Sequence, residues 1–74
     1  MSMQKEDCIH QLLQSLQLQS EKIGGAVLEI QDLNSNQKYR QVFLIIYDLK
    51  ENGLWIPSNE DEKNLEKFWW EYAN

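Results

Sequence analysis

Three groups of polar side chains have residue types that could do chemistry, and each group is incomplete. Asp32, Asn34 and Asn36 repeat the alternating oxygen ligands that open an EF-hand calcium loop. That motif also needs a glycine for its sharp turn and a bidentate glutamate at its end, where this chain has Gln37 and Phe43. Because Asn and Asp are common in loops for backbone reasons, we interpret the segment as a plain loop.

The second group is Cys8 with His10, which are the single cysteine and the single histidine of the chain. Two ligands do not complete a structural zinc site. Two positions apart on a helix, the side chains point to different sides and cannot act together as nucleophile and base. We therefore predict no metal, no cofactor and no catalytic residue, and we expect that the protein is not an enzyme.

The third group is the run of acids Glu60, Asp61 and Glu62. Acids in the first turn of a helix face water and stabilise the helix N-terminus. Asp61 follows Ser58 by three residues, which is the spacing of a capping box. The remaining interpretation is that these acids, with Glu66, form a negative patch for a basic partner.

The elements that would position these groups predict an α+β fold. Apolar residues spaced by three and four indicate a helix over 4–22, and a second helix is predicted over 58–73. Between them the sequence predicts strands over 26–31, 39–49 and 54–56, with Asn-Gly as a tight hairpin turn before the last strand. The expected order is αβββα in one domain of 74 residues, with both helices on one face of a three-stranded antiparallel meander.

The long central strand contains an unbroken apolar run over 42–47. Alternate side chains of a strand point to opposite faces, so both faces need cover. Two helices on one side cover either Phe43, Ile45 and Tyr47 or their alternates, and leave the other face open to water. The face chosen as the open one carries Val42, Leu44 and Ile46. An exposed apolar patch of this kind usually marks an interaction surface, so we predict that these residues bind a protein partner. A two-fold homodimer is the first expectation for that partner.

Two large apolar residues lie off the helical stripes. Leu18 projects among glutamines almost opposite the apolar face of the first predicted helix. Trp70 falls outside the stripe of the last helix, where it either folds over the sheet edge or forms a binding hot spot. Both residues are included in the predicted partner-binding set.

The charge balance limits the classes of partner. The chain has 12 acidic and 7 basic residues, and its net charge of -5 repels nucleic-acid phosphates and anionic membranes. With one cysteine, no apolar leader and no membrane-length apolar stretch, a cytoplasmic location is expected. The function predicted is that of a small acidic interaction protein, either a regulator, an adaptor or an inhibitor.

A second hypothesis starts from the concentration of acids in residues 48–74, which carry seven of the twelve. Charge spaced along a helix could imitate the phosphates of a nucleic acid. The protein would then inhibit a DNA- or RNA-binding enzyme, as a phage anti-restriction or anti-CRISPR protein does.

Overall fold

The protein is a bundle of helices. A computed structural model of the chain describes residues 5–19 and 23–74. The elements are α1 (Lys5–Leu18), α2 (Gly24–Ser35), α3 (Tyr39–Glu51), α4 (Asn59–Phe68) and a final π-helical turn, η1 (Trp69–Ala73).

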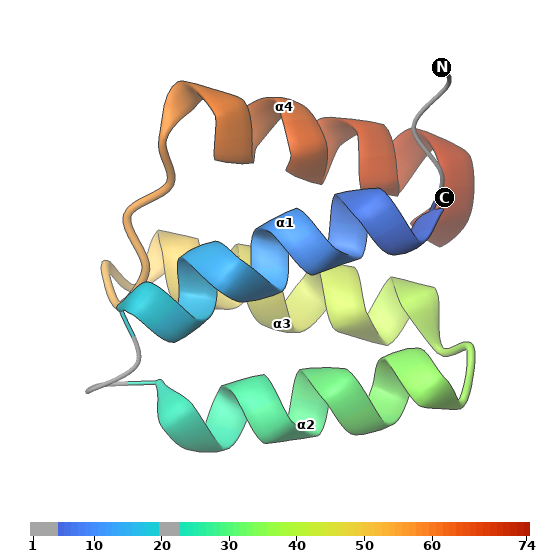
Figure 1. Cartoon of the computed structure of the whole chain (residues 1–74), viewed down its shortest axis with the longest axis horizontal. Helices are drawn as coiled ribbons and strands as arrows, with labels where there is room; N and C mark the ends of the chain where they lie inside the picture. Colours follow the sequence, from blue (N-terminus) through green and yellow to red (C-terminus); the bar gives the residue numbers. More distant parts are fainter. Residues whose placement is uncertain (1–4, 20–22) are drawn as a thin grey trace.

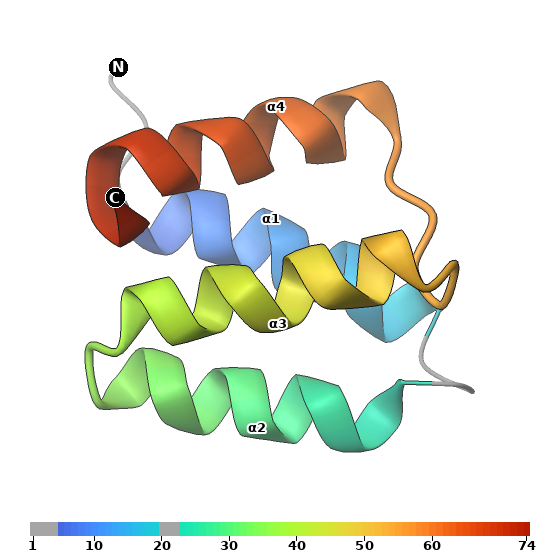
Figure 2. The same ribbon diagram turned by 180° about the vertical axis from the view of Figure 1, so that it is seen from behind.

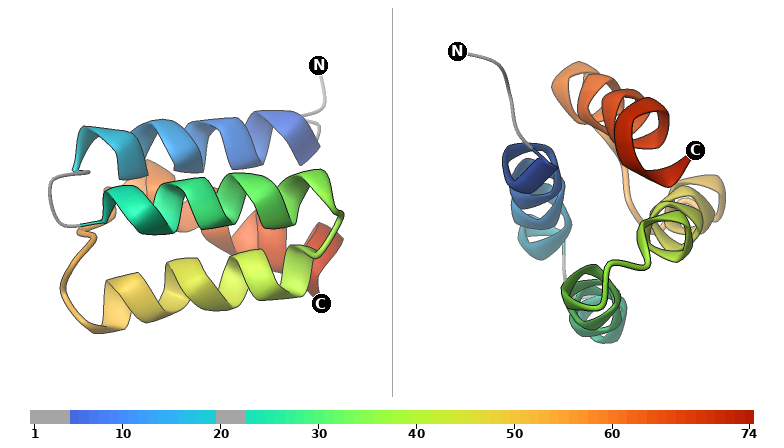
Figure 3. Two further views of the ribbon diagram at one scale, coloured as in Figure 1. Left: turned by 90° about the horizontal axis from the view of Figure 1, so that it is seen from below. Right: turned by 90° about the vertical axis from the view of Figure 1, so that its right-hand side faces the viewer.

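Consecutive helices run in opposite directions (Figure 1; Figure 2). The helix α2 packs against both α1 and α3, and α3 packs against η1. The end view in Figure 3 shows α1, α2, α3 and α4 in order around a common centre, and α4 returns to pack against α1. This is the up-down-up-down topology of an antiparallel four-helix bundle.

Each helix turns an apolar stripe toward that centre, with residues spaced by three and four. The connection between α3 and α4 adds a tryptophan, and η1 adds an alanine. The buried core residues are Ile9, Leu12, Leu16, Ile23, Val27, Ile30, Val42, Ile46, Leu49, Trp55, Leu65, Phe68 and Ala73.

The predicted αβββα fold is wrong, because the described residues contain no strand. The segment 26–31 lies in α2, 39–49 lies in α3, and 54–56 belongs to the connection before α4. The helix predicted over 4–22 is present as α1 from Lys5 to Leu18, whereas Gln19 forms a turn and residues 4 and 20–22 lie outside the described residues. The helix predicted over 58–73 is present as α4 with η1. Because the described residues form no sheet, the prediction that both helices lie on one sheet face is also wrong.

The apolar run in α3 has a helical explanation. Val42, Ile46 and Leu49 are spaced by four and three and are buried in the core. Phe43 and Ile45 lie on the two flanks of this stripe and are half-buried against it. A helix in a bundle touches the core and a neighbour on each side, so consecutive apolar residues are buried without any strand.

The sequence of α2 satisfies two periods at once, and the structure selects the helical one. Ala26, Leu28 and Ile30 alternate as in a strand, whereas Val27, Ile30 and Leu33 follow a helical stripe. Val27 and Ile30 are buried, while the side chain of Leu28 is 69% exposed. The alternating pattern therefore does not describe the buried face.

The connection between α3 and α4 is fixed to α1. Trp55 is buried, and its indole Nε1 donates a hydrogen bond to the Ser15 hydroxyl at 3.1 Å. The Gln19 side chain donates to the Ile56 carbonyl at 2.9 Å and accepts from the Ile56 N–H at 2.8 Å. These bonds close one end of the bundle.

The opposite end is closed by η1. The Asn74 N–H donates to the Trp69 carbonyl at 2.7 Å, which is the five-residue step of a π-helix. Arg40 Nε donates to the Ala73 carbonyl at 3.3 Å and so satisfies one acceptor at this helix end. Three aromatic rings pack together there: Tyr39, Phe68 and Tyr72.

The predicted hairpin turn at Asn52 and Gly53 is instead the end of α3. Gly53 has a φ of 71°, and its N–H donates to the Lys50 carbonyl at 3.1 Å. The Leu54 N–H donates to the Leu49 carbonyl at 3.0 Å. This pair of bonds is the Schellman motif, which requires the same left-handed residue as a hairpin turn.

A second Schellman motif ends α2, with a glutamine in the left-handed position. The Gln37 N–H donates to the Asn34 carbonyl at 3.0 Å, and the Lys38 N–H donates to the Leu33 carbonyl at 2.9 Å. Gln37 has a φ of 61°, which costs a residue with a Cβ roughly 1 kcal/mol.

These two helix ends predict opposite effects of substitution on stability. Gly53→Ala lowers the free energy of unfolding by about 1 kcal/mol, because alanine strains the left-handed backbone. Gln37→Gly raises it by several tenths to about 1 kcal/mol. Chemical denaturation followed by circular dichroism measures both values.

Gly25→Ala is the matched control. Gly25 lies in the first turn of α2, and nothing lies within 4 Å of an added Cβ. Alanine there raises stability by about 0.5 to 1 kcal/mol through helix propensity. If Gly53→Ala stabilised the protein as Gly25→Ala does, the left-handed helix end would be refuted.

Candidate functional site

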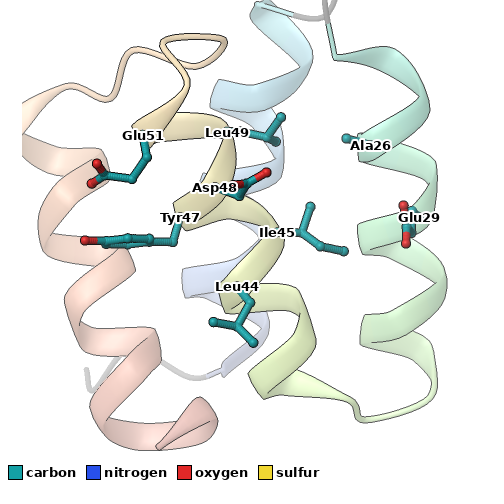
Figure 4. A pocket seen from close by; sticks show the side chains of 8 residues that line it. All are labelled: Ala26, Glu29, Leu44, Ile45, Tyr47, Asp48, Leu49 and Glu51. Carbon is teal, nitrogen blue, oxygen red and sulfur yellow. The ribbon is translucent and has the colours of Figure 1, made fainter.

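An open groove runs along the surface between α2 and α3. Two of its lining residues belong to α2 and the other six to α3. In Figure 4, Ile45 points toward α2, whereas Tyr47 and Glu51 extend from the opposite side of α3. Its lining residues are Ala26, Glu29, Leu44, Ile45, Tyr47, Asp48, Leu49 and Glu51. The floor is apolar because Ile45 and Ala26 are only half-buried where the two helices meet.

Two large apolar side chains stand above this groove on the outer face of α3. Leu44 is 54% exposed and Tyr47 is 44% exposed, and their spacing of three places them next to each other. We call this pair the α3 ridge. The Tyr47 ring stacks on the Phe43 ring at 5.8 Å, and Phe43 packs against Trp69 at 4.8 Å. The tyrosine is therefore held in place from its inner side.

Three exposed acids border the groove, and none of the described residues that line it is basic. Glu29 extends from α2, while Asp48 and Glu51 extend from α3 (Figure 4). The basic residue next to Glu51 along the chain, Lys50, faces α4 and pairs with Glu62 at 3.2 Å. The groove thus combines an apolar floor with a negative rim.

Sequence reasoning missed the acids Glu29, Asp48 and Glu51 as site residues. In a strand, Asp48 falls on the same face as Leu44, and Glu51 lies in the following turn. In a helix, Leu44, Asp48 and Glu51 share one face at spacings of four and seven. If residues 39–51 are interpreted as a helix, the sequence predicts that Asp48 and Glu51 lie on the same face as Leu44.

The prediction that Val42, Leu44 and Ile46 share an uncovered face is wrong. That face existed only in a strand, and in α3 the side chains of Val42 and Ile46 turn inward. Both are fully buried in the bundle core. Leu44 is exposed, and its assignment to a binding surface stays a prediction.

Leu18 and Trp70 are both exposed, at 88% and 64%, but the structure does not bring them together. Leu18 ends α1, beside the connection held by Gln19. Trp70 lies on η1 at the opposite end of the bundle (Figure 1). Neither residue lines the groove between α2 and α3.

Two of the predicted patch acids are engaged within the protein. Asp61 Oδ2 accepts hydrogen bonds from the Ser15 hydroxyl at 2.7 Å and from the Ser58 N–H at 3.0 Å. The capping box of Ser58 and Asp61 is confirmed. Glu62 forms the ion pair with Lys50. The Asp61 carboxylate therefore joins α1 to the start of α4.

The other two patch acids, Glu60 and Glu66, face solvent. Lys63 is exposed on the same helix, and Lys67 is half-buried one turn further on. Acidic and basic side chains thus alternate on the outer surface of α4, so this helix has no uninterrupted negative stripe.

The remaining candidate groups are not assembled into a reactive site. The predicted loop at Asp32, Asn34 and Asn36 is wrong, because the first two lie in α2 and the third caps its end. Asn36 Nδ2 donates to the Asp32 carbonyl at 3.0 Å. Cys8 is buried and His10 is exposed on α1. Among the described residues, no three His, Cys, Asp or Glu side chains are grouped to hold a metal ion.

Comparison of the chain with protein-family models, with curated proteins and with solved structures gives no match. The fold itself defines the class, which is an all-α antiparallel four-helix bundle. Within residues 5–19 and 23–74, no helix has both the length and the apolarity needed to cross a bilayer.

The contacts of Asp61 predict that it stabilises the fold. Asp61→Ala lowers the free energy of unfolding by about 2 kcal/mol, because the capping box and the acceptor of Ser15 are lost together. Urea denaturation measures this change. Glu60→Ala is the control, with an effect of at most about 0.5 kcal/mol from the helix dipole. Equal effects of the two substitutions would contradict this role.

Proposed function

We propose that this protein is a small, acidic, non-enzymatic interaction module of the cytoplasm. It binds another protein and acts as its regulator, its adaptor or its inhibitor. The binding surface is the groove between α2 and α3 together with the α3 ridge. The observation that carries the proposal is the exposure of Leu44 and Tyr47 side by side above an apolar groove. Contiguous exposed apolar surface is typical of interaction sites.

The placement of the reactive groups supports a non-enzymatic role. The thiol of Cys8 is buried in α1, and the imidazole of His10 is on the exposed side of the same helix. The described residues that line the groove offer three carboxylates and the Tyr47 phenol, and none of them is a serine, cysteine, histidine or lysine.

A homodimer has less support than a different partner. It was predicted from an uncovered sheet face, and α3 buries two of the three residues of that face. A two-fold dimer through the groove would set Glu29, Asp48 and Glu51 against the same three acids of the second copy. Like charges brought together in this way oppose association.

Nucleic-acid mimicry also has less support. It needs a continuous array of negative charge, whereas Lys63 and Lys67 interrupt the acids of α4. The Asp61 carboxylate is half-buried and bonded to Ser15, and Glu62 is paired with Lys50. Only Glu60 and Glu66 of the predicted acidic patch remain available to imitate phosphates.

The proposal predicts that Leu44→Glu abolishes partner binding while Leu28→Glu does not. Leu28 is exposed on α2 and does not line the groove, so it controls for surface charge and apolarity. A photo-reactive phenylalanine at position 47 first identifies the bound protein by cross-linking in the source cells. Calorimetry with that purified partner should then show a loss of about 30-fold or more for Leu44→Glu.

Circular dichroism checks that both variants keep the helix content of the parent protein. Leu28→Glu should stay within about two-fold of the parent affinity, which is the range of a near-neutral position. The proposal fails if Leu44→Glu binds as tightly as the parent, or if the only cross-linked product is a second copy of this chain.

A further inference from the structure

On the basis of the proposed function, we propose that the segment docking between α2 and α3 is an amphipathic helix with lysine or arginine beside its apolar face. Three features of the groove specify this occupant: its shape, its apolar floor and the charge on its rim.

The shape of the groove suits a helix. Two neighbouring antiparallel helices leave a straight furrow between them, and an amphipathic helix commonly binds in such a furrow. The lining residues of α3 run from Leu44 to Glu51, which is about 10 Å along the helix axis. A helix of roughly three turns covers that distance and reaches beyond it at each end.

The floor of the groove provides the apolar contact. Ala26 has a small side chain, and Figure 4 shows Ile45 pointing toward α2 in the space beside it. Leu44 stands at the edge of this space and is more than half exposed. A leucine or a larger apolar residue of the partner would bury all three side chains, as the anchor of a helical ligand does.

The rim of the groove selects the charge of the partner. Glu29 lies on the α2 side and Glu51 on the far side of α3, with Asp48 between them (Figure 4). Among the described residues, these three carboxylates form no ion pair. A neutral helix would remove water from them without replacing its hydrogen bonds, and this desolvation opposes binding. Cationic side chains on either side of an apolar face would satisfy them.

The test uses a defined probe. The probe is a helical peptide of about 12 residues, built from leucine and lysine with the leucines on one face. Two control peptides have glutamate in place of lysine, or the same composition in a scrambled order. Binding is measured by calorimetry at low and at physiological salt, and the contacted residues are mapped from backbone amide shifts.

The matched variants remove the same charge from two different surfaces. The groove variant combines Glu29→Gln, Asp48→Asn and Glu51→Gln. The control variant combines three exposed acids of α4 and η1: Glu60→Gln, Glu66→Gln and Glu71→Gln. We expect the lysine peptide to shift the amides of the groove, to bind about tenfold more weakly to the groove variant, and to bind the control variant as the parent protein.

Several outcomes overturn this inference, and they differ in what they say of the proposed function. Equal weakening by both variants, or equal binding of the scrambled peptide, shows that only the overall charge is recognised. Binding that requires Leu44 but not the three acids removes the cationic partner and leaves the interaction module in place. If the peptide fails to bind while the natural partner still requires Leu44, the same conclusion follows. If neither the peptide nor the natural partner needs Leu44 for binding, both the cationic helix and the proposed interaction surface are refuted.

Discussion

The constraint that governs this structure is the burial of one helix on three sides. In a chain of 74 residues, α3 contacts the core and also α2 and η1, so three of its sides carry apolar residues. Val42 and Ile46 face the centre, with Phe43 and Ile45 on the flanks. The remaining side of α3 faces water, and the candidate binding surface lies on it. Its exposed residues are Arg40, Gln41, Leu44, Tyr47, Asp48 and Glu51. The exposure of Leu44 within it has no role in packing that the structure shows.

The two ends of the bundle are stabilised by different means. At one end the connection before α4 depends on polar contacts with α1, where Ser15 bonds both Trp55 and Asp61. At the other end aromatic rings and the π-helical turn close the core, and Arg40 satisfies a terminal carbonyl. The groove between α2 and α3 lies apart from these hydrogen bonds, but its Tyr47 stacks on Phe43, which packs against Trp69 of η1. A partner that contacts Tyr47 therefore also touches the aromatic packing at the second end.

The sequence predicted those parts of the fold whose signals are local. The stripe of α1 and the capping box at Ser58 require only spacing within a helix, and both are confirmed. The strands predicted in the middle of the chain were wrong because β-branched and aromatic residues favour strands. A short apolar run also fits the period of a strand as well as that of a helix. Gly53 marked a left-handed residue correctly, but a hairpin and a helix end both need one. The groove could not be predicted from the sequence, because Glu29 and Asp48 line the same surface only when α2 and α3 pack as neighbours.

The packing of α1 on α4 also has a consequence for the order in which the molecule folds. These two helices are in contact, and the hydrogen bond between Ser15 and Asp61 joins residues 46 positions apart. Bringing such distant segments together costs loop-closure entropy before the contact stabilises anything. The neighbouring helices α2 and α3 are separated by only a short connection, so we expect their pairing to form before α4 closes on α1.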